Sequence, residues 1–152
     1  MVYDFAEDST VQIAKPLSQL EPRLRLVQNS SRGALNAIKT GFKVAEADAV
    51  LLLMVDDPPS IIEQIDPLVE KFYSENASIG VASRYMRGGE HVGGPWLKGF
   101  LSRMAGLSLY YVIGLPTHDA TYATRLYRKS FLNSVTIEAE KGFEMTLELT
   151  LK

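Results

Sequence analysis

The chain contains no cysteine among its 152 residues, which excludes disulfides, catalytic thiolates and zinc sites built on cysteine. It also lacks an excess of positive charge, because 16 Lys and Arg face 18 Asp and Glu and the formal net charge is -2. Composition therefore gives no chain-wide attraction for nucleic acid or an anionic membrane. Any anion site has to be local.

Long hydrophobic runs are missing as well. The longest apolar stretches, residues 49–55 and 107–115, fall well short of the roughly 20 residues that a membrane helix needs. The first ten residues hold acids and no basic flank ahead of an apolar core, so they do not form a signal peptide. We therefore expect a cytoplasmic protein, in which any membrane contact is either peripheral, at the cytoplasmic face, or made by sequence outside this chain.

Several common catalytic motifs are absent. Without a Gly-x-Gly-x-x-Gly or a Walker A lysine motif, dinucleotide binding and ATP hydrolysis lose their usual support. Without a Gly-x-Ser-x-Gly elbow, a serine hydrolase is not expected. His118 and Asp119 are neighbours, but adjacent side chains of an extended segment point to opposite sides and do not form a catalytic dyad.

What the chain does contain is the pattern of an α/β fold. With 46% hydrophobic and 22% charged residues, residues 1–152 suit a single globular domain. Apolar runs predict strands at residues 2–4, 23–28, 49–55, 78–83 and 123–128. Helical periods predict helices at 9–19, capped by Ser9 or Thr10, at 32–45, capped by Ser30 or Ser31, and at 60–74, 96–113 and 142–152. This alternation favours a mostly parallel sheet flanked by helices.

The sharpest local feature is an apolar strand that stops at two acids. Asp56 and Asp57 follow the run 51–55 and precede Pro58 and Pro59. Ligands of open α/β sheets bind at the carboxyl ends of strands, and Mg²⁺ or Mn²⁺ binds carboxylate oxygens together with phosphate and water. The acids therefore form either a metal site or a turn in which aspartate stabilises the bend. The local pattern leaves both open.

Other polar residues mark candidate ligand sites. Asp4 follows the first apolar run and can accept hydrogen bonds from a base or ribose, whereas Asp8 is favoured as a helix cap. Asp119 is open to three roles: a base, an acceptor from a sugar hydroxyl, or an Asx turn. Residues 84–95 hold four glycines and predict a long mobile loop. Around it gather basic residues that are either phosphate ligands or merely solvated, namely Arg84, Arg87, His91, Lys98 and Arg103.

Six blocks in this order resemble the family-2 glycosyltransferases, in particular the branch of dolichyl-phosphate and polyprenyl-phosphate sugar synthases. Residues 2–10 resemble that family's acidic VDDGSTD-type strand end, and residues 51–59 resemble its DxD strand. Residues 117–129 are similar to its Asp-x-x-Ser-Gly-Phe-Arg stretch. The other blocks are residues 29–42, like its Asn-x-Gly-x-Gly helix start, residues 82–89, like its Gly-Ser-Arg-Tyr segment, and residues 95–106, like the helix after it.

The resemblance implies a GT-A fold and the inverting transfer of a sugar from a UDP- or GDP-sugar to a polyprenyl or dolichyl phosphate, with Mg²⁺ or Mn²⁺. Such an acceptor is already an anion, so a strong general base is less necessary. The resemblance implies nucleotide contacts for Asp4, Asp8, Arg32 and Gly33, metal binding for Asp56 and Asp57, acceptor-phosphate binding for Arg84, Lys98 and Ser102, and a sugar pocket lined by Asp119 and Arg125. Asp119, Arg84 and Lys98 are the catalytic candidates.

Departures from the family pattern bear on this site. If Asp56 matches the second acid of DxD, Met54 replaces the first, which makes Asp56 a better metal candidate than Asp57. Ala123 and Thr124 stand where the family has Gly-Phe. The family's first strand, with its Pro-x-Tyr-Asn-Glu-like segment, is not found. Since the sequence begins at an apparent strand and ends inside an apparent helix, we expect both ends to have been cut from a larger protein.

Two other functions stay open at this point. A nucleotidyltransferase shares the metal, the nucleotide and the sheet, although its glycine-rich Arg/Lys loop after the first strand is not visible. A non-catalytic remnant would keep the fold and bind a nucleotide sugar without turnover. The expected partners are a nucleotide-sugar donor and a lipid-phosphate or other acceptor, with no nucleic acid. A homo-oligomer is left open.

Overall fold

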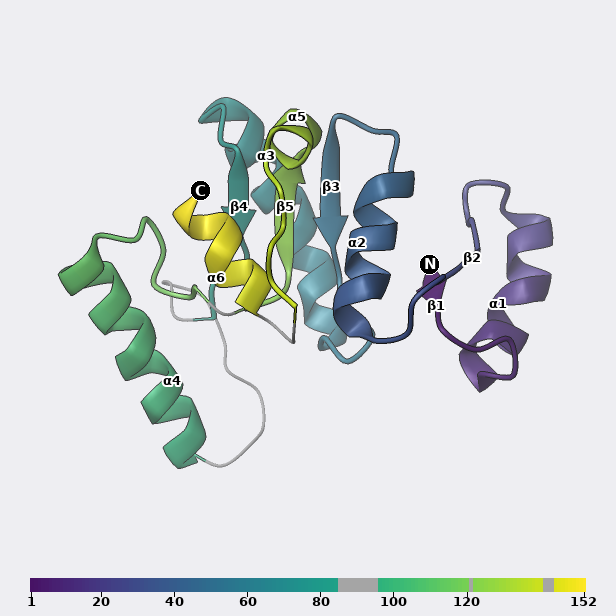
Figure 1. Ribbon diagram of the computed structural model, residues 1–152, viewed down its shortest axis with the longest axis horizontal. Helices are drawn as coiled ribbons and strands as arrows, with labels where there is room; N and C mark the ends of the chain where they lie inside the picture. The colour runs from purple at the N-terminus through teal and green to yellow at the C-terminus, as the bar shows by residue number, and fades with distance from the viewer. Residues whose placement is uncertain (85–95, 121, 141–143) are drawn as a thin grey trace. The chain divides into compact units, whose positions relative to one another are not determined.

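The structure is a computed structural model that describes residues 1–84, 96–120, 122–140 and 144–152 (Figure 1). Contacts between residues divide it into two compact units, residues 1–46 and residues 47–152. Each unit is described by itself. The predicted mobile loop, with Arg87 and His91, falls almost wholly within 85–95 and lies outside the described residues.

The first unit contains two short parallel strands and two helices. Strand β1 (Val2–Tyr3) pairs with β2 (Val27–Gln28), so that Val2 lies opposite Val27. Helix α1 (Ser9–Leu20) and helix α2 (Ala34–Val44) supply the buried residues Val11, Ala14, Leu35, Ile38 and Phe42. The elements are the predicted ones, but β2 covers only the end of the predicted strand.

The caps of the two helices of this unit agree only in part with the prediction. The Asp8 carboxylate accepts a hydrogen bond from the Thr10 N–H at 2.7 Å, so the cap favoured for Asp8 is confirmed, whereas neither Ser9 nor Thr10 caps α1. Gly33 precedes α2 with φ at 106°, a left-handed value that favours glycine. The predicted serine cap of α2 is therefore wrong, because the chain turns at Gly33 before the helix begins.

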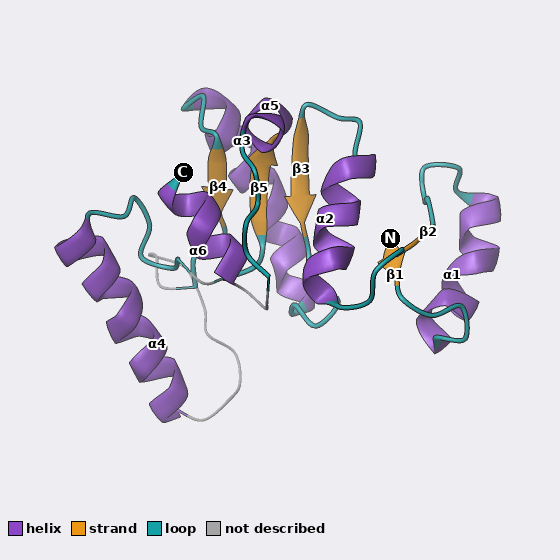
Figure 2. Cartoon of the chain, viewed as in Figure 1, coloured by secondary structure: helices purple, strands orange, loops and turns teal. Residues whose placement is uncertain are grey.

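The second unit is built on a sheet of three strands in the order β3 (Ala49–Leu52), β5 (Arg125–Arg128), β4 (Ile79–Val81). Strand β5 is antiparallel to both neighbours, so β3 and β4 run the same way (Figure 2). The prediction of a mostly parallel sheet is therefore wrong for this unit, because both of its strand pairs are antiparallel. In the first unit β1 and β2 are parallel. The α/β class is confirmed.

Helices cover both faces of this sheet, with α6 (Glu144–Leu151) in front and α3 (Ile65–Ser74) behind in Figure 1. A Cβ at Gly80 would lie 3.1 Å from Leu68 Cδ1, so glycine at this position lets α3 approach β4 closely. The predicted helix 60–74 divides into a 3-10 turn, Pro59–Gln64, and α3. Helix α4 (Trp96–Ser108) continues as a π-helix, Leu109–Ile113. Helix α5 (Lys129–Ser134), only six residues long, was not predicted.

Within the described part of the chain, no helix has both the length and the apolar character required to cross a bilayer.

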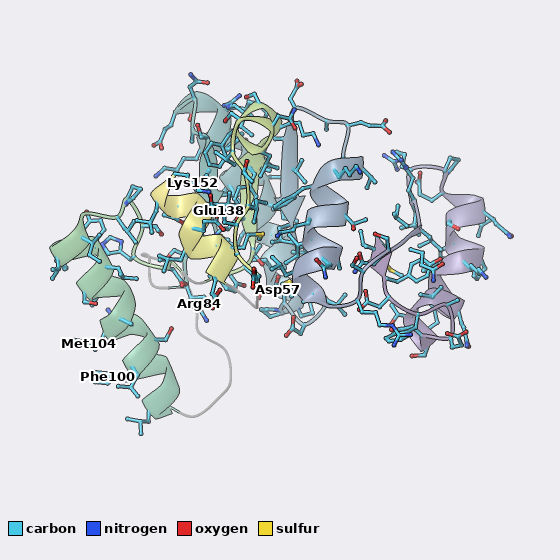
Figure 3. All side chains as sticks on the ribbon, viewed as in Figure 1. Asp57, Arg84, Phe100, Met104, Glu138 and Lys152 are labelled. Atoms are coloured by element: carbon cyan, nitrogen blue, oxygen red, sulfur yellow. The ribbon has the colours of Figure 1, made fainter. Side chains whose placement is uncertain are left out.

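Glu148 joins α6 to the segment that precedes it. Its carboxylate accepts hydrogen bonds from the N–H groups of Glu138 and Ala139, each at 2.8 Å, and from Lys152 Nζ at 2.7 Å. The Glu138 N–H, followed by Lys152, lowers the pKa of Glu148 from 4.5 to about 2. Figure 3 marks Glu138 and Lys152 beside α6.

Because the folded pKa is lowered, the Glu148 carboxylate should stabilise the fold fully above about pH 4.5 and lose this effect as the pH falls towards 2. An NMR titration should show the Glu138 and Ala139 amide signals moving with a midpoint near pH 2, and Glu148→Gln should remove that transition. Glu75→Gln, which alters an exposed pair with Lys71, should leave it unchanged. A midpoint at the ordinary glutamate value would contradict this account.

Candidate active site

The direction of β5 decides which residues meet. Arg125, at the start of β5, pairs with Leu52 at the end of β3 and with Val81 at the end of β4. The segment that enters β5 is therefore brought to the carboxyl ends of both neighbouring strands. Figure 3 shows Asp57 and Arg84, which follow those strands, at the same end of the sheet.

The Asp57 carboxylate accepts hydrogen bonds both from its own turn and from the segment that leads into β5. Its Oδ1 accepts from the Tyr122 hydroxyl at 2.9 Å, and its Oδ2 accepts from the Thr124 hydroxyl and from the Met54 N–H, the latter at 3.0 Å. The Asp57 N–H in turn donates to the Met54 carbonyl at 3.2 Å. The turn that sequence reasoning offered as the alternative is confirmed for Asp57, and its carboxylate also ties the end of β3 to the start of β5.

Asp56, by contrast, is exposed, and the structure gives its carboxylate no hydrogen-bond partner among the described residues. Those residues also contain no group of three or more His, Asp or Glu that would enclose a metal by themselves. An available Asp56 carboxylate beside an oriented Asp57 nevertheless fits Mg²⁺ or Mn²⁺, which commonly takes one or two carboxylates and completes its shell with water and phosphate. Metal binding by either acid stays a prediction.

Arg84 and Asp119 form a two-point ion pair. Arg84 Nε donates to Asp119 Oδ2 and a terminal nitrogen donates to Oδ1, both at 2.9 Å, while the Arg84 N–H reaches Oδ2 at 3.2 Å. Asp119 is 1% exposed, whereas the Arg84 side chain is 23% exposed. The carboxylate thus holds the guanidinium in place, a role that sequence reasoning did not consider for Asp119. Its predicted contact with a sugar stays a prediction.

Tyr122 lies between these two groups. The Arg84 guanidinium carbon stands 4.6 Å from the centre of the Tyr122 ring, a cation–π distance, and the hydroxyl donates to Asp57. Burial, and then the bond to Asp57, raises the pKa of Tyr122 above its ordinary value, so the phenol remains a donor at neutral pH. The sequence did not mark Tyr122 and Thr124 as site residues, because neither side chain carries a charge. Their place in the 117–129 block was the available signal.

Arg125 does not line a pocket in this structure. It is 0% exposed, and burial lowers the pKa of its guanidinium. It donates to the Tyr122 carbonyl at 2.7 Å, to the carbonyls of Asp119 and Thr146 at 3.0 Å, and to the Ala120 carbonyl and the Thr150 hydroxyl. The predicted sugar contact is corrected to an internal role, since a buried guanidinium whose donors are occupied has no surface for a ligand.

The nucleotide candidates belong to the first unit. Asp4 accepts from the Gly33 N–H at 2.9 Å and from Asn29 Nδ2 at 2.8 Å. The Gly33 bond, followed by the Asn29 bond, lowers the pKa of Asp4. The guanidinium carbon of Arg32 lies 4.5 Å from the centre of the Phe5 ring. The structure therefore brings Asp4 next to Gly33 and Arg32, and adds Asn29, which directly follows β2; their nucleotide contacts stay a prediction.

The structure does not bring the remaining site candidates, Asp8, Lys98 and Ser102, together with other predicted site residues among those it describes. Asp8 uses its carboxylate as the cap of α1, and its nucleotide contact stays untested. Ser102 is half-buried and Arg103 is exposed on α4. Lys98 belongs to α4, but its side chain lies outside the described residues.

Comparison with known proteins decides the family. The sequence model of glycosyl transferase family 2 matches residues 1–136. The chain belongs to this family. The resemblance of the six blocks is thereby confirmed, and the α/β sheet is that of a GT-A fold.

Two curated relatives of this member of glycosyl transferase family 2 carry names that support the branch expected from the sequence. The "Polyprenol monophosphomannose synthase" of Mycolicibacterium smegmatis is 28% identical over 99% of this chain and 58% of its own length. The "Dolichol-phosphate mannosyltransferase" of Pyrococcus furiosus is 25% identical over 100% of this chain and 43% of its own length. The chain thus spans about half the length of these two relatives.

Removing the buried guanidinium should destabilise the second unit. In Arg125→Met the carbonyls of residues 119, 120, 122 and 146 lose their donor inside the protein, so the free energy of unfolding should fall by about 3–5 kcal/mol. Urea denaturation followed by circular dichroism would measure it. Arg25→Met, which breaks an exposed pair with Glu46, should cost less than about 1 kcal/mol. Equal effects of the two substitutions would contradict the internal role.

Proposed function

We propose that this family-2 glycosyltransferase moves a sugar, mannose being the one that its relatives' names carry, from a GDP- or UDP-sugar to the phosphate of a polyprenyl or dolichyl lipid. The observation that carries the proposal is the arrangement at one end of the sheet. There the Arg84 guanidinium pairs with Asp119 and packs over the Tyr122 ring, and the Tyr122 hydroxyl donates a hydrogen bond to Asp57 in the acidic turn. A guanidinium suits the acceptor phosphate, and carboxylates suit a divalent metal ion that would bind the donor's diphosphate.

The reaction is a single displacement. An oxygen of the lipid phosphate attacks the anomeric carbon, the bond from that carbon to the donor's diphosphate oxygen breaks, and the nucleoside diphosphate leaves. Attack opposite the leaving group inverts the anomeric centre. Since the attacking phosphate is already an anion, no side chain has to remove a proton, which agrees with an Asp119 carboxylate wholly engaged by Arg84.

Arg84 is the group best placed to receive a phosphate. Its charge is held by a buried carboxylate and by a ring, so the guanidinium does not have to be ordered when the ligand arrives. Preorganised donors of this kind stabilise developing charge more effectively than flexible ones. A divalent ion held by Asp56, with Asp57 beside it, would neutralise the charge on the leaving diphosphate.

Helix α4 supports a lipid acceptor. Four of its apolar residues are about half exposed, namely Leu97, Phe100, Leu101 and Met104, and Figure 3 marks two of them on the helix. At its other end the Tyr110 ring, in the π-helix that continues α4, stacks on His118 at 4.0 Å, next to Asp119. An exposed apolar face is typical of surfaces that meet lipid or protein, and it supports peripheral membrane contact.

The alternatives make different predictions. Membership of the family removes the main support for a nucleotidyltransferase. A non-catalytic remnant would bind the donor and transfer nothing, so binding and turnover have to be measured separately.

Calorimetry with GDP- and UDP-sugars, with and without Mn²⁺, tests the donor site. We expect one donor to bind in a metal-dependent manner, and Asp56→Ala to weaken that binding by roughly 10-fold or more, since a carboxylate ligand is lost. Asp66→Ala, at the exposed start of α3, is the matched control and should bind as the unaltered chain does. Metal-dependent binding that survives Asp56→Ala would overturn the assignment of Asp56, and binding of no donor would overturn the function.

Transfer of labelled sugar to a short polyprenyl phosphate tests Arg84. Arg84→Lys keeps a charge for Asp119 but loses the two-point geometry, so we expect kcat/KM for the acceptor to fall by about 10²-fold. Arg23→Lys makes the same change in an exposed pair with Glu21 and should alter this value little. Equal rates for Arg84→Lys and the unaltered chain would exclude Arg84 as the phosphate ligand, and binding without any transfer in the unaltered chain would favour the remnant.

A further inference from the structure

Tyr122 makes two contacts that are chemically independent of each other. Its hydroxyl donates to Asp57 Oδ1 at 2.9 Å, and the face of its ring receives the Arg84 guanidinium at 4.6 Å. One contact needs the oxygen and the other needs only the ring. The same side chain therefore touches the acidic turn after β3 and the basic residue after β4.

The backbone of Tyr122 is itself fixed. Its carbonyl accepts from Arg125 Nε at 2.7 Å, and Arg125 is wholly buried. Two residues on, the Thr124 hydroxyl donates to the other oxygen of Asp57. A side chain anchored in this way couples the position of β5 to both charged groups, because its backbone carbonyl, its hydroxyl and its ring each make a contact.

We propose that Tyr122 is a positioning residue that sets the spacing between the Asp57 carboxylate and the Arg84 guanidinium, the first through its hydroxyl and the second through its ring. This inference rests on the proposed function only for the identity of the ligands, a divalent metal on the acidic side and a phosphate on the basic side. The family pattern Asp-x-x-Ser-Gly-Phe-Arg has serine where this chain has Tyr122, so the double contact is a property of this chain's own sequence.

Two substitutions separate the contacts. Tyr122→Phe removes the hydroxyl and keeps the ring, so the NMR signal of the Asp57 carboxyl carbon should move while hydrogen exchange at Arg84 Nε stays as before. Tyr122→Leu removes both, so exchange at Arg84 Nε should also become faster by roughly 2- to 5-fold, as expected for the loss of a cation–π contact. Mn²⁺ titrated alone, followed by water proton relaxation, should bind roughly 10-fold more weakly to both variants, because a hydrogen bond to a charged group is lost.

Tyr73 offers a matched control. It is half exposed on α3, its ring lies 5.7 Å from the Arg128 guanidinium, and it packs edge-on against Phe72. Tyr73→Phe and Tyr73→Leu make the same chemical changes beside another arginine and should leave the Asp57 and Arg84 signals and the Mn²⁺ affinity unchanged.

The NMR readings decide the inference even if the chain transfers no sugar, in which case only the proposed function is refuted. An Asp57 carboxyl signal that does not move in Tyr122→Phe overturns the inference, and so does an Arg84 exchange rate that responds equally to both Tyr122 substitutions. If enzyme activity is present, KM for the acceptor phosphate should rise in Tyr122→Leu and stay near its original value in Tyr122→Phe.

Discussion

The buried guanidinium of Arg125 is the interaction on which the candidate site depends. It lies at the first position of β5 and donates to the carbonyls of Asp119, Ala120 and Tyr122 as well as to Thr146 of α6. Carbonyls that turn into the protein need donors, because an unmet buried acceptor costs about 1–3 kcal/mol. Arg125 supplies these donors from one side chain, and in doing so it shapes the segment that carries Asp119 and Tyr122.

Each buried or half-buried charge at this end of the sheet has a partner that offsets the cost of removing it from water. Asp119, which is almost wholly buried, faces Arg84, and Arg84 also rests on the Tyr122 ring. Asp57 is balanced by neutral donors, the hydroxyls of Tyr122 and Thr124 and a backbone N–H. A carboxylate held by neutral donors keeps its charge available to a cation, whereas a carboxylate paired with arginine does not. Asp57 and Asp119 thus differ in what they can do, although both are aspartates at the same end of the sheet.

In the first unit, Asp4 is likewise held by neutral hydrogen-bond donors. Asp4 accepts from Asn29 and from the Gly33 N–H, and Asn29 in turn accepts from the Thr40 hydroxyl at 3.0 Å. The left-handed backbone of Gly33 lets the chain present its N–H to Asp4 just before α2 begins. The family blocks include Asp4, Asn29 and Gly33, but the sequence assigned no role to Asn29, because its partner Asp4 lies 25 positions away.

The family, the α/β class and the approximate place of most helices and strands follow from the amino-acid sequence, because they depend on local periodicity and on blocks of residues in a fixed order. The sequence also places Arg84, Asp119 and the acids at 56 and 57 near strand ends. Which of these groups meet depends on contacts between distant parts of the chain. The antiparallel pairing of β5 between β3 and β4 is set by contacts between residues more than 40 positions apart in the sequence. That pairing turned Arg125 inward, joined Asp119 to Arg84, and brought Tyr122 to Asp57, and no local pattern encodes such pairings.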